Sequence, residues 1–172
     1  MPNLSPRASM SLPGDAVGEP MIRVRAVTLS DAYPLWLWVN DPETRGASFA
    51  GAEVPWSDHL RWLAARLTDE SSVVLIGEDD SRPMGSVRFD TRDGWRTARL
   101  SYVVAPEARG QGGGSMLVRE GLTHLTGLRS GVRVWAEVKP TNERSLRVFR
   151  GLGWSEEKTA GDSTTFWWEK AR

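Results

Sequence analysis

The segment from Val103 to Leu117 reads VVAPEARGQGGGSML, and it decides the fold. It passes from a short apolar run typical of a β-strand, through a turn and a glycine-dense loop, into a helical pattern. Its loop glycines are Gly110, Gly112, Gly113 and Gly114. Because glycine has no side chain, backbone N–H groups there can approach a ligand closely. The unpaired first N–H groups and the dipole of the following helix favour an anion, so the segment predicts a phosphate or pyrophosphate site with Arg109 at its rim.

Two other phosphate-binding motifs do not fit this loop. A Walker A loop needs Gly-Lys-Ser/Thr, and the loop holds no lysine. A Rossmann fingerprint reads Gly-x-Gly-x-x-Gly, and when it is counted from Gly110 its last glycine falls on Ser115. A glycine-rich connection that binds no ligand is the alternative for this segment considered alone.

A second segment, from Val134 to Ser145, reads VWAEVKPTNERS. Its alternation of apolar and polar residues predicts a strand, with Glu137 on the face opposite the valines. Pro140 ends that strand, and a helix follows that Thr141 or Asn142 can cap.

Together the two segments resemble those of the GNAT superfamily of acyl-CoA-dependent N-acyltransferases. The Arg-Gly-x-Gly-x-Gly loop of that superfamily corresponds to Arg109 to Gly114. Its later Asn-x-x-Ser and Gly-aromatic elements correspond to the residues Asn142, Ser145, Gly153 and Trp154. The resemblance covers residues 21 to 172 and implies one acetyltransferase domain there. Residues 1 to 20 are rich in Pro, Ser and Gly, and we expect a disordered tail.

The expected fold is therefore α/β (α+β) of the GNAT type. We expect a mixed, mostly antiparallel sheet of about six or seven strands with about four helices, in the order β-α-α-β-β-β-α-β-α-β-β. Residues 45 to 54 are rich in Gly and Ala and are expected to form a loop. The helix that follows should begin at Ser57, with Leu60, Leu63 and Leu67 as its apolar stripe.

The resemblance implies acetyl-CoA as cosubstrate and no metal. Its pyrophosphate would lie along the residues Arg109, Gly110, Gln111, Gly112, Gly113, Gly114 and Ser115. The acetyl carbonyl would accept a hydrogen bond from the backbone N–H of Val103 or Val104, where this strand separates from its neighbour. Asn142 would reach the pantetheine.

The catalytic residues are less clearly indicated. Many relatives place a proton-donating tyrosine where this chain has Phe149, so Tyr102 or Ser145 is the candidate acid, unless the thiolate leaves unassisted. Glu137 and His59 are the candidate bases. The competing interpretations are a glutamate held by an arginine and a histidine that packs or caps a helix.

The front half resembles, more narrowly, the nucleotide-amino-sugar N-acetyltransferases of the pseudaminic acid pathway. The matches lie in Trp38–Arg45, His59–Trp62 and Gly85–Asp90. They imply that the acceptor amine, on a nucleotide-linked deoxy-aminosugar, is bound by Asn40, Arg45, Trp62, Arg88 and Asp90. Acetyltransferases of protein N-termini, ribosomal proteins or aminoglycosides are alternatives, as is a non-catalytic acyl-CoA sensor.

Composition agrees with a small-molecule enzyme. The 172 residues carry 22 basic and 22 acidic side chains, which leaves no electrostatic footprint for nucleic acid or an anionic membrane. The chain has no cysteine for disulfides or nucleophilic catalysis and too few histidines for a histidine-rich metal site. It shows neither a secretory signal nor an apolar run of ~20 residues, so we expect a cytoplasmic protein. A homodimer would also fit the resemblance.

Overall fold

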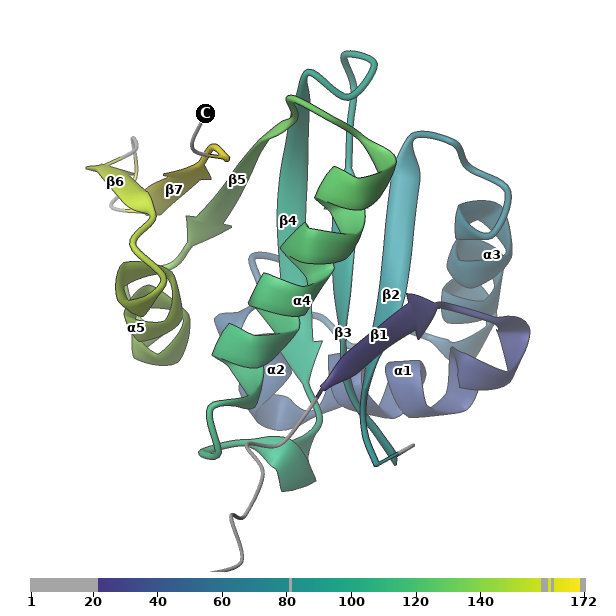
Figure 1. Ribbon diagram of the computed structural model, residues 1–172. Coiled ribbons are helices and arrows are strands. Elements are labelled where there is room, and N and C mark those ends of the chain that lie inside the picture. The colour runs from purple at the N-terminus through teal and green to yellow at the C-terminus, as the bar shows by residue number, and fades with distance from the viewer. Residues whose placement is uncertain (1–21, 81, 159–160, 162, 171–172) are drawn as a thin grey trace, which may run out of the picture.

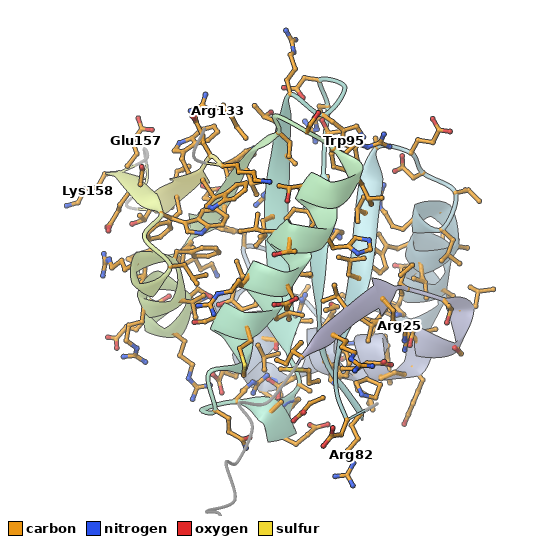
Figure 2. The ribbon with its side chains drawn as sticks, viewed as in Figure 1. Arg25, Arg82, Trp95, Arg133, Glu157 and Lys158 are labelled. Carbon is orange, nitrogen blue, oxygen red and sulfur yellow. The ribbon has the colours of Figure 1, made fainter. Side chains whose placement is uncertain are left out.

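The computed structural model describes residues 22–80, 82–158, 161 and 163–170. The expected tail, residues 1 to 20, lies outside this range. The described residues form one seven-stranded sheet with the order β1-β2-β3-β4-β5-β7-β6, flanked by helices on both faces (Figure 1), and Figure 2 shows the same view with the side chains. Its neighbouring strands are antiparallel, except that β4 and β5 are parallel. This confirms the expected fold class.

The element order follows the expectation with one addition. The strands are β1 (Arg23–Ala26), β2 (Ser72–Asp79), β3 (Arg82–Asp90), β4 (Thr97–Val104), β5 (Arg133–Val138), β6 (Ser155–Lys158) and β7 (Thr164–Trp168). The α-helices are α1 (Ala32–Asn40), α2 (Pro42–Ala47), α3 (Trp56–Arg66), α4 (Gly113–Leu128) and α5 (Glu143–Gly151), and short 3-10 turns lie at Leu29–Asp31 and Pro106–Ala108. The addition is α2.

Helix α2 corrects the prediction of a loop from residue 45. Asp41 caps it by accepting a hydrogen bond from the Thr44 backbone N–H at 3.1 Å, and Pro42 occupies its first turn. None of its side chains is buried, so it has no apolar periodicity from which it could be predicted.

Helix α3 also differs from its predicted form. It begins at Trp56 rather than Ser57, and its buried side chains are His59 and Leu63. Leu67, predicted to belong to the apolar stripe, is 38% exposed. Leu60 is partly buried and packs against the same cluster as Leu63, so the buried face of α3 includes His59 and ends before Leu67.

Two apolar clusters lie on opposite faces of the sheet. One joins α4 and α5 to the sheet through residues such as Leu117, Leu125 and Phe149. The other joins α1 and α3 to β2, with Leu35 and Leu63 fully buried. The sheet thus carries an apolar cluster on each face, and the candidate site lies where strands β4 and β5 part.

That parting is visible in the strand register. Strand β4 pairs with β5 only at Thr97, Ala98 and Arg99, although β4 continues to Val104 and β5 to Val138. On its other edge, β4 stays paired with β3 up to Val104. A gap therefore opens between the ends of β4 and β5.

Candidate functional site

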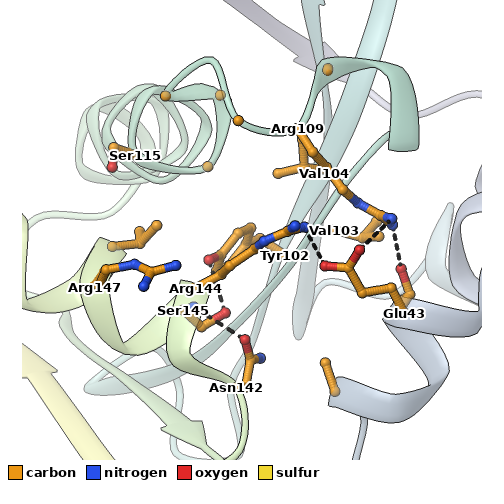
Figure 3. Close-up of a pocket in the computed structure, with 18 residues that line it drawn as sticks. Glu43, Tyr102, Val103, Val104, Arg109, Ser115, Asn142, Arg144, Ser145 and Arg147 are labelled. Carbon is orange, nitrogen blue, oxygen red and sulfur yellow. Dashed lines mark hydrogen bonds and ion pairs between the residues drawn. The ribbon is translucent and has the colours of Figure 1, made fainter.

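A cavity of about 370 Å³ lies beside this gap (Figure 3). Its walls are the end of β4, the glycine loop, the first turn of α4, the N-terminal half of α5 and helix α2. The volume is within the range of small-molecule pockets. A second cavity, of about 450 Å³, lies between helices α2 and α5. The residues that line both cavities are Glu43, Ala47, Asn142, Arg144 and Arg147.

The glycine loop forms one wall as predicted, and two of its glycines require their residue type. Gly110 has φ +80° and Gly112, the N-cap of α4, has φ +77°, a left-handed conformation that side chains rarely adopt. Gly114 lies so close to Tyr102 and Val148 that an added Cβ would be 3.3 Å from each. The loop thus exposes backbone rather than side chains to the cavity. Gln111, included in the prediction, is exposed and lies outside the cavity wall.

The gap leaves one predicted backbone donor available. Ala105 N–H donates to the Met84 carbonyl at 2.8 Å. Because N–H groups point alternately to the two sides of a strand, the Val103 N–H points to β3 and the Val104 N–H points into the gap. Of the two predicted donors, Val104 is therefore the one that can contact a ligand, and Val103 contributes only to the wall.

Tyr102 and Ser145 meet across the cavity, from β4 and α5. Their hydroxyl groups are 2.9 Å apart, and Asn142 fixes this end of α5 by accepting from the Ser145 backbone N–H at 3.1 Å. The Tyr102 ring lies edge-on to Phe149, with centroids 5.9 Å apart. Burial raises the pKa of Tyr102 above its ordinary value, although the bond to Ser145 opposes this. Tyr102 is therefore protonated at neutral pH and able to donate a proton.

Arg109 does not project freely at the rim. Its Nη2 lies 2.6 Å from an Asp41 carboxylate oxygen and 3.1 Å from the Thr44 hydroxyl, and its Nη1 lies 3.2 Å from Glu43. The Arg109 guanidinium, which donates a hydrogen bond to the Asp41 carboxylate, lowers the pKa of Asp41 below its ordinary value. Glu43 also pairs with Arg144 of α5 (Figure 3). The carboxylates of α2 therefore reach both the glycine loop and α5.

Glu137 lies on the other face of the sheet. Its neighbours Ala136 and Val138 belong to the cluster under α4 and α5, so Glu137 points to the opposite side. Its carboxylate accepts a hydrogen bond from the Ser163 hydroxyl at 3.0 Å and lies 3.7 Å from Arg99. It does not line the cavity, and both predictions, a base and a carboxylate held by an arginine, fit its position.

His59 is placed as a packing residue. It is 2% exposed, its Nε2 lies 2.8 Å from the Ala32 carbonyl oxygen, and its ring lies between Trp56 and Trp62. It lines neither cavity. Its burial and its contacts fit the packing alternative, and the role of His59 as a general base stays a prediction.

Burial of His59 has a measurable consequence for acid stability. Desolvation lowers the pKa of His59 below its ordinary 6.5. Below that pH the unfolded chain takes up a proton that the folded chain resists, so the free energy of unfolding falls as pH is lowered from 7 towards 5. We expect H59Q, which keeps an N–H donor for Ala32, to reduce this pH slope by up to about 1.4 kcal/mol per unit. Urea unfolding at both pH values tests this, and an unchanged slope would contradict it.

Two of the predicted acceptor residues hold a loop. Asn40 makes two hydrogen bonds to the Val54 backbone, at 2.8 and 3.0 Å. Arg45 donates to the carbonyls of Ala50 and Ala52, both at 3.1 Å. These side chains hold the segment between α2 and α3, and their contact with an acceptor stays a prediction.

The other three predicted acceptor residues lie together, Trp62 on α3 and Arg88 and Asp90 on β3. Arg88 lies 2.8 Å from Asp90, and its guanidinium is 5.4 Å from the centre of the Trp62 ring. Burial lowers the pKa of Arg88, and the neighbouring Arg66 and Arg99 cations act in the same direction. This cluster shares a sheet face with Glu137, since Arg88 and Asp90 lie opposite Ser101 and Arg99 of β4.

Sequence reasoning missed the residues that α2 and α5 bring to the cavity. They are Glu43, Thr44, Ala47, Arg144, Arg147 and Val148. The one available signal was Asp41-Pro42, a typical helix start, which would have placed Glu43 on a helix. Among the described residues, no helix is long and apolar enough to cross a membrane, and no cluster of three or more potential metal ligands occurs.

Comparison with known proteins gives one family. Residues 22–155 match the family model described as an acetyltransferase (GNAT) domain. No curated protein sequence matches the chain.

Solved structures share the fold at low identity. A spermidine N-acetyltransferase from Vibrio cholerae, in complex with CoA and spermine, has a TM-score of 0.77 at 15% identity over 87% of this chain and 95% of that one. A domain from Methanocaldococcus jannaschii has a TM-score of 0.75 at 20% identity over 88% of this chain and 99% of that one. An aminoglycoside acetyltransferase in complex with coenzyme A has a TM-score of 0.72 at 21% identity over 87% and 95%.

Proposed function

The chain belongs to the GNAT acetyltransferase family, and we propose that it transfers an acetyl group from acetyl-CoA to a primary amine on a nucleotide-linked deoxy-aminosugar. The observation that carries the transfer is the junction of three features at one cavity. These are the glycine loop at the start of α4, the outward Val104 N–H and the Tyr102–Ser145 pair.

The residues at the cavity fit the proposed cosubstrate. The side-chain-free wall and the unpaired N–H groups at the start of α4 suit the diphosphate of CoA. Asn142, at the far end of the same cavity, would lie along the pantetheine arm. When bound, acetyl-CoA supplies the acetyl thioester, and the gap between β4 and β5 gives it a path between the two faces of the sheet.

The side chains divide the proton transfers between these faces. On the face of α4 and α5, Tyr102 holds the proton that the leaving thiolate needs, and Ser145 orients its hydroxyl group. On the opposite face, Glu137 is the carboxylate that can take a proton from the incoming amine. Between them, the Val104 N–H can donate to the carbonyl oxygen as it gains negative charge. This arrangement performs direct transfer without a covalent enzyme adduct.

The paired hydroxyl groups can be tested as one unit. We expect Y102F and S145A each to lower kcat by about tenfold, less than a general acid usually contributes, because a thiolate is a good leaving group. If the hydroxyl groups act together, the double variant loses no more than the larger single loss. Steady-state kinetics at saturating acetyl-CoA measures this. Additive losses would show that the two hydroxyl groups act independently, and no loss in either variant would show that the thiolate leaves unassisted.

The charge around Arg88 supports an acceptor that carries phosphate. Arg66, Arg88 and Arg99 lie close enough for their charges to interact, and each is paired with one carboxylate, that of Asp69, Asp90 or Glu137. A diphosphate would gain charge-assisted hydrogen bonds from the same guanidinium groups. Trp62, already stacked on Arg88, offers a flat apolar surface beside them.

A panel of amines tests the proposed acceptor. Release of free CoA is followed with a UDP-linked 4-amino-deoxysugar, the same sugar without the nucleotide, kanamycin, spermine and a peptide with a free N-terminus. We expect kcat/KM to be highest for the UDP-linked sugar, by at least about tenfold over the free sugar. A higher value for kanamycin, spermine or peptide would replace the proposed acceptor. Binding of acetyl-CoA with no turnover of any amine would favour a sensor.

A further inference from the structure

Glu43 stands at the mouth of the cavity between two cationic side chains. One carboxylate oxygen lies 3.2 Å from Arg109 Nη1, at the glycine loop, and the other pairs with Arg144 of α5. Both arginines line the cavity in which the proposed function places the phosphates of CoA (Figure 3). An anion of the protein itself thus lies between two of the cavity arginines that an anionic ligand could use, the third being Arg147.

Glu43 and Asp41 both pair with Arg109, but their side chains differ in how far they are exposed to solvent. The Asp41 and Arg109 side chains are 17% and 18% exposed, and Asp41 also caps α2, so their ion pair belongs to the fold. Glu43 and Arg144 are 52% and 57% exposed. An exposed pair contributes little free energy and exchanges readily, whereas a mostly buried pair is costly to break. Glu43 is therefore the carboxylate that a ligand can displace.

Helix α2 is suited to such an exchange. None of its side chains is buried, and it is held at its start by Arg109 and at its end by Lys139, which donates to the carbonyls of Gly46 and Ser48. Rotation of the Glu43 side chain away from the cavity breaks no apolar packing. The cost of the exchange is therefore limited to the two ion pairs of Glu43.

We propose that Glu43 is an internal competitor for the phosphate groups of the cofactor and thereby sets the affinity of the protein for CoA. This rests on the proposed function, because it takes the cavity to be the CoA site. In the free protein the carboxylate neutralises Arg109 and Arg144. On binding, phosphate oxygens replace it at one or both guanidinium groups. Glu43 is thus an affinity-determining residue for the cofactor, with no part in the proton transfers.

The test is calorimetric titration of CoA into the wild-type protein and three variants at low ionic strength. E43Q removes the charge, and E43D keeps the charge but shortens the side chain by one methylene. E107Q is the matched control, since Glu107 lies on the turn before Arg109, is exposed and makes no hydrogen bond or ion pair within the described residues. A melting curve for each variant establishes that it is folded.

We expect E43Q to bind CoA about two- to fivefold more tightly than wild type, as the loss of an exposed ion-pair competitor predicts. E43D should also bind CoA more tightly than wild type, because its shorter side chain reaches Arg109 and Arg144 less well. E107Q should bind CoA as tightly as wild type. The KM for acetyl-CoA should fall with the dissociation constant. Equal or weaker binding by E43Q overturns the inference, as does an equal gain in E107Q, which would indicate a general charge effect. Absence of CoA binding in wild type and all variants would instead overturn the proposed function.

Discussion

Replacement of Ser115 by glutamate is expected to weaken CoA binding by at least about 100-fold while leaving the fold intact. Ser115 lies in the first turn of α4 and lines the cavity. A carboxylate there would face the diphosphate at short range. Two unit charges 4 Å apart interact by about 4 kcal/mol at an effective dielectric constant of 20, and tenfold in affinity is only about 1.4 kcal/mol. The repulsion therefore exceeds the loss that we predict.

The same substitution should not destabilise the protein. A negative charge in the first turn of a helix interacts favourably with the helix dipole, by about 0.3–1 kcal/mol. Ser115 is only partly buried, so a longer side chain can extend towards the cavity. An increase or no change in melting temperature, together with lost CoA binding, would separate the electrostatic effect from misfolding.

S115Q is the matched control because glutamine has the size and shape of glutamate without its charge. We expect it to cost at most about fivefold in CoA affinity, the effect of a partly blocked cavity. Calorimetry of CoA with both variants gives the comparison. Equal losses in S115E and S115Q would mean that the site is only sterically sensitive. If S115E bound CoA as tightly as wild type, the proposal that the diphosphate lies at the start of α4 would be contradicted.

Much of this cofactor site could be predicted from the sequence because it depends on backbone. Positive φ at Gly110 and Gly112 and close contact at Gly114 leave few alternatives to glycine, so the requirement is visible in the residue types. The alternation of β5 and the cap at Asn142 are also local patterns. Local rules therefore identified the glycine loop and the helix α5 that line the cavity, together with the strand β5 that precedes α5.

The acceptor side could not be predicted in the same way. Asn40 bonds to Val54 and Lys139 to Gly46, contacts between residues far apart in the chain that no local pattern reveals. His59 looked suited to catalysis by its residue type, yet burial against Ala32 gives it a packing role. A short helix without an apolar face, α2, left no periodicity to detect. Function assigned to polar residues from sequence was therefore least reliable where the fold uses those residues for its own hydrogen bonds.

The division of the sheet into two faces is the basis for our proposal that Glu137 is the general base. Tyr102 packs against the α4 and α5 cluster, while Glu137 points to the opposite face at the end of β5. An amine that enters from that face meets a carboxylate before it reaches the gap. A carboxylate used as general base typically contributes 10²–10⁴-fold.

We expect E137Q to lower kcat by about 10²–10³-fold with the CoA dissociation constant unchanged, because glutamine cannot accept the proton and Glu137 does not line the cofactor cavity. S163A is the control: it removes the hydroxyl group that donates to Glu137 at 3.0 Å but keeps the carboxylate, and should cost at most about threefold. Steady-state rates with the preferred amine and calorimetry with CoA measure the two quantities. A kcat of E137Q within about threefold of wild type would contradict the proposed base. Glu137 would then serve only to pair with Arg99, and the amine would lose its proton to water.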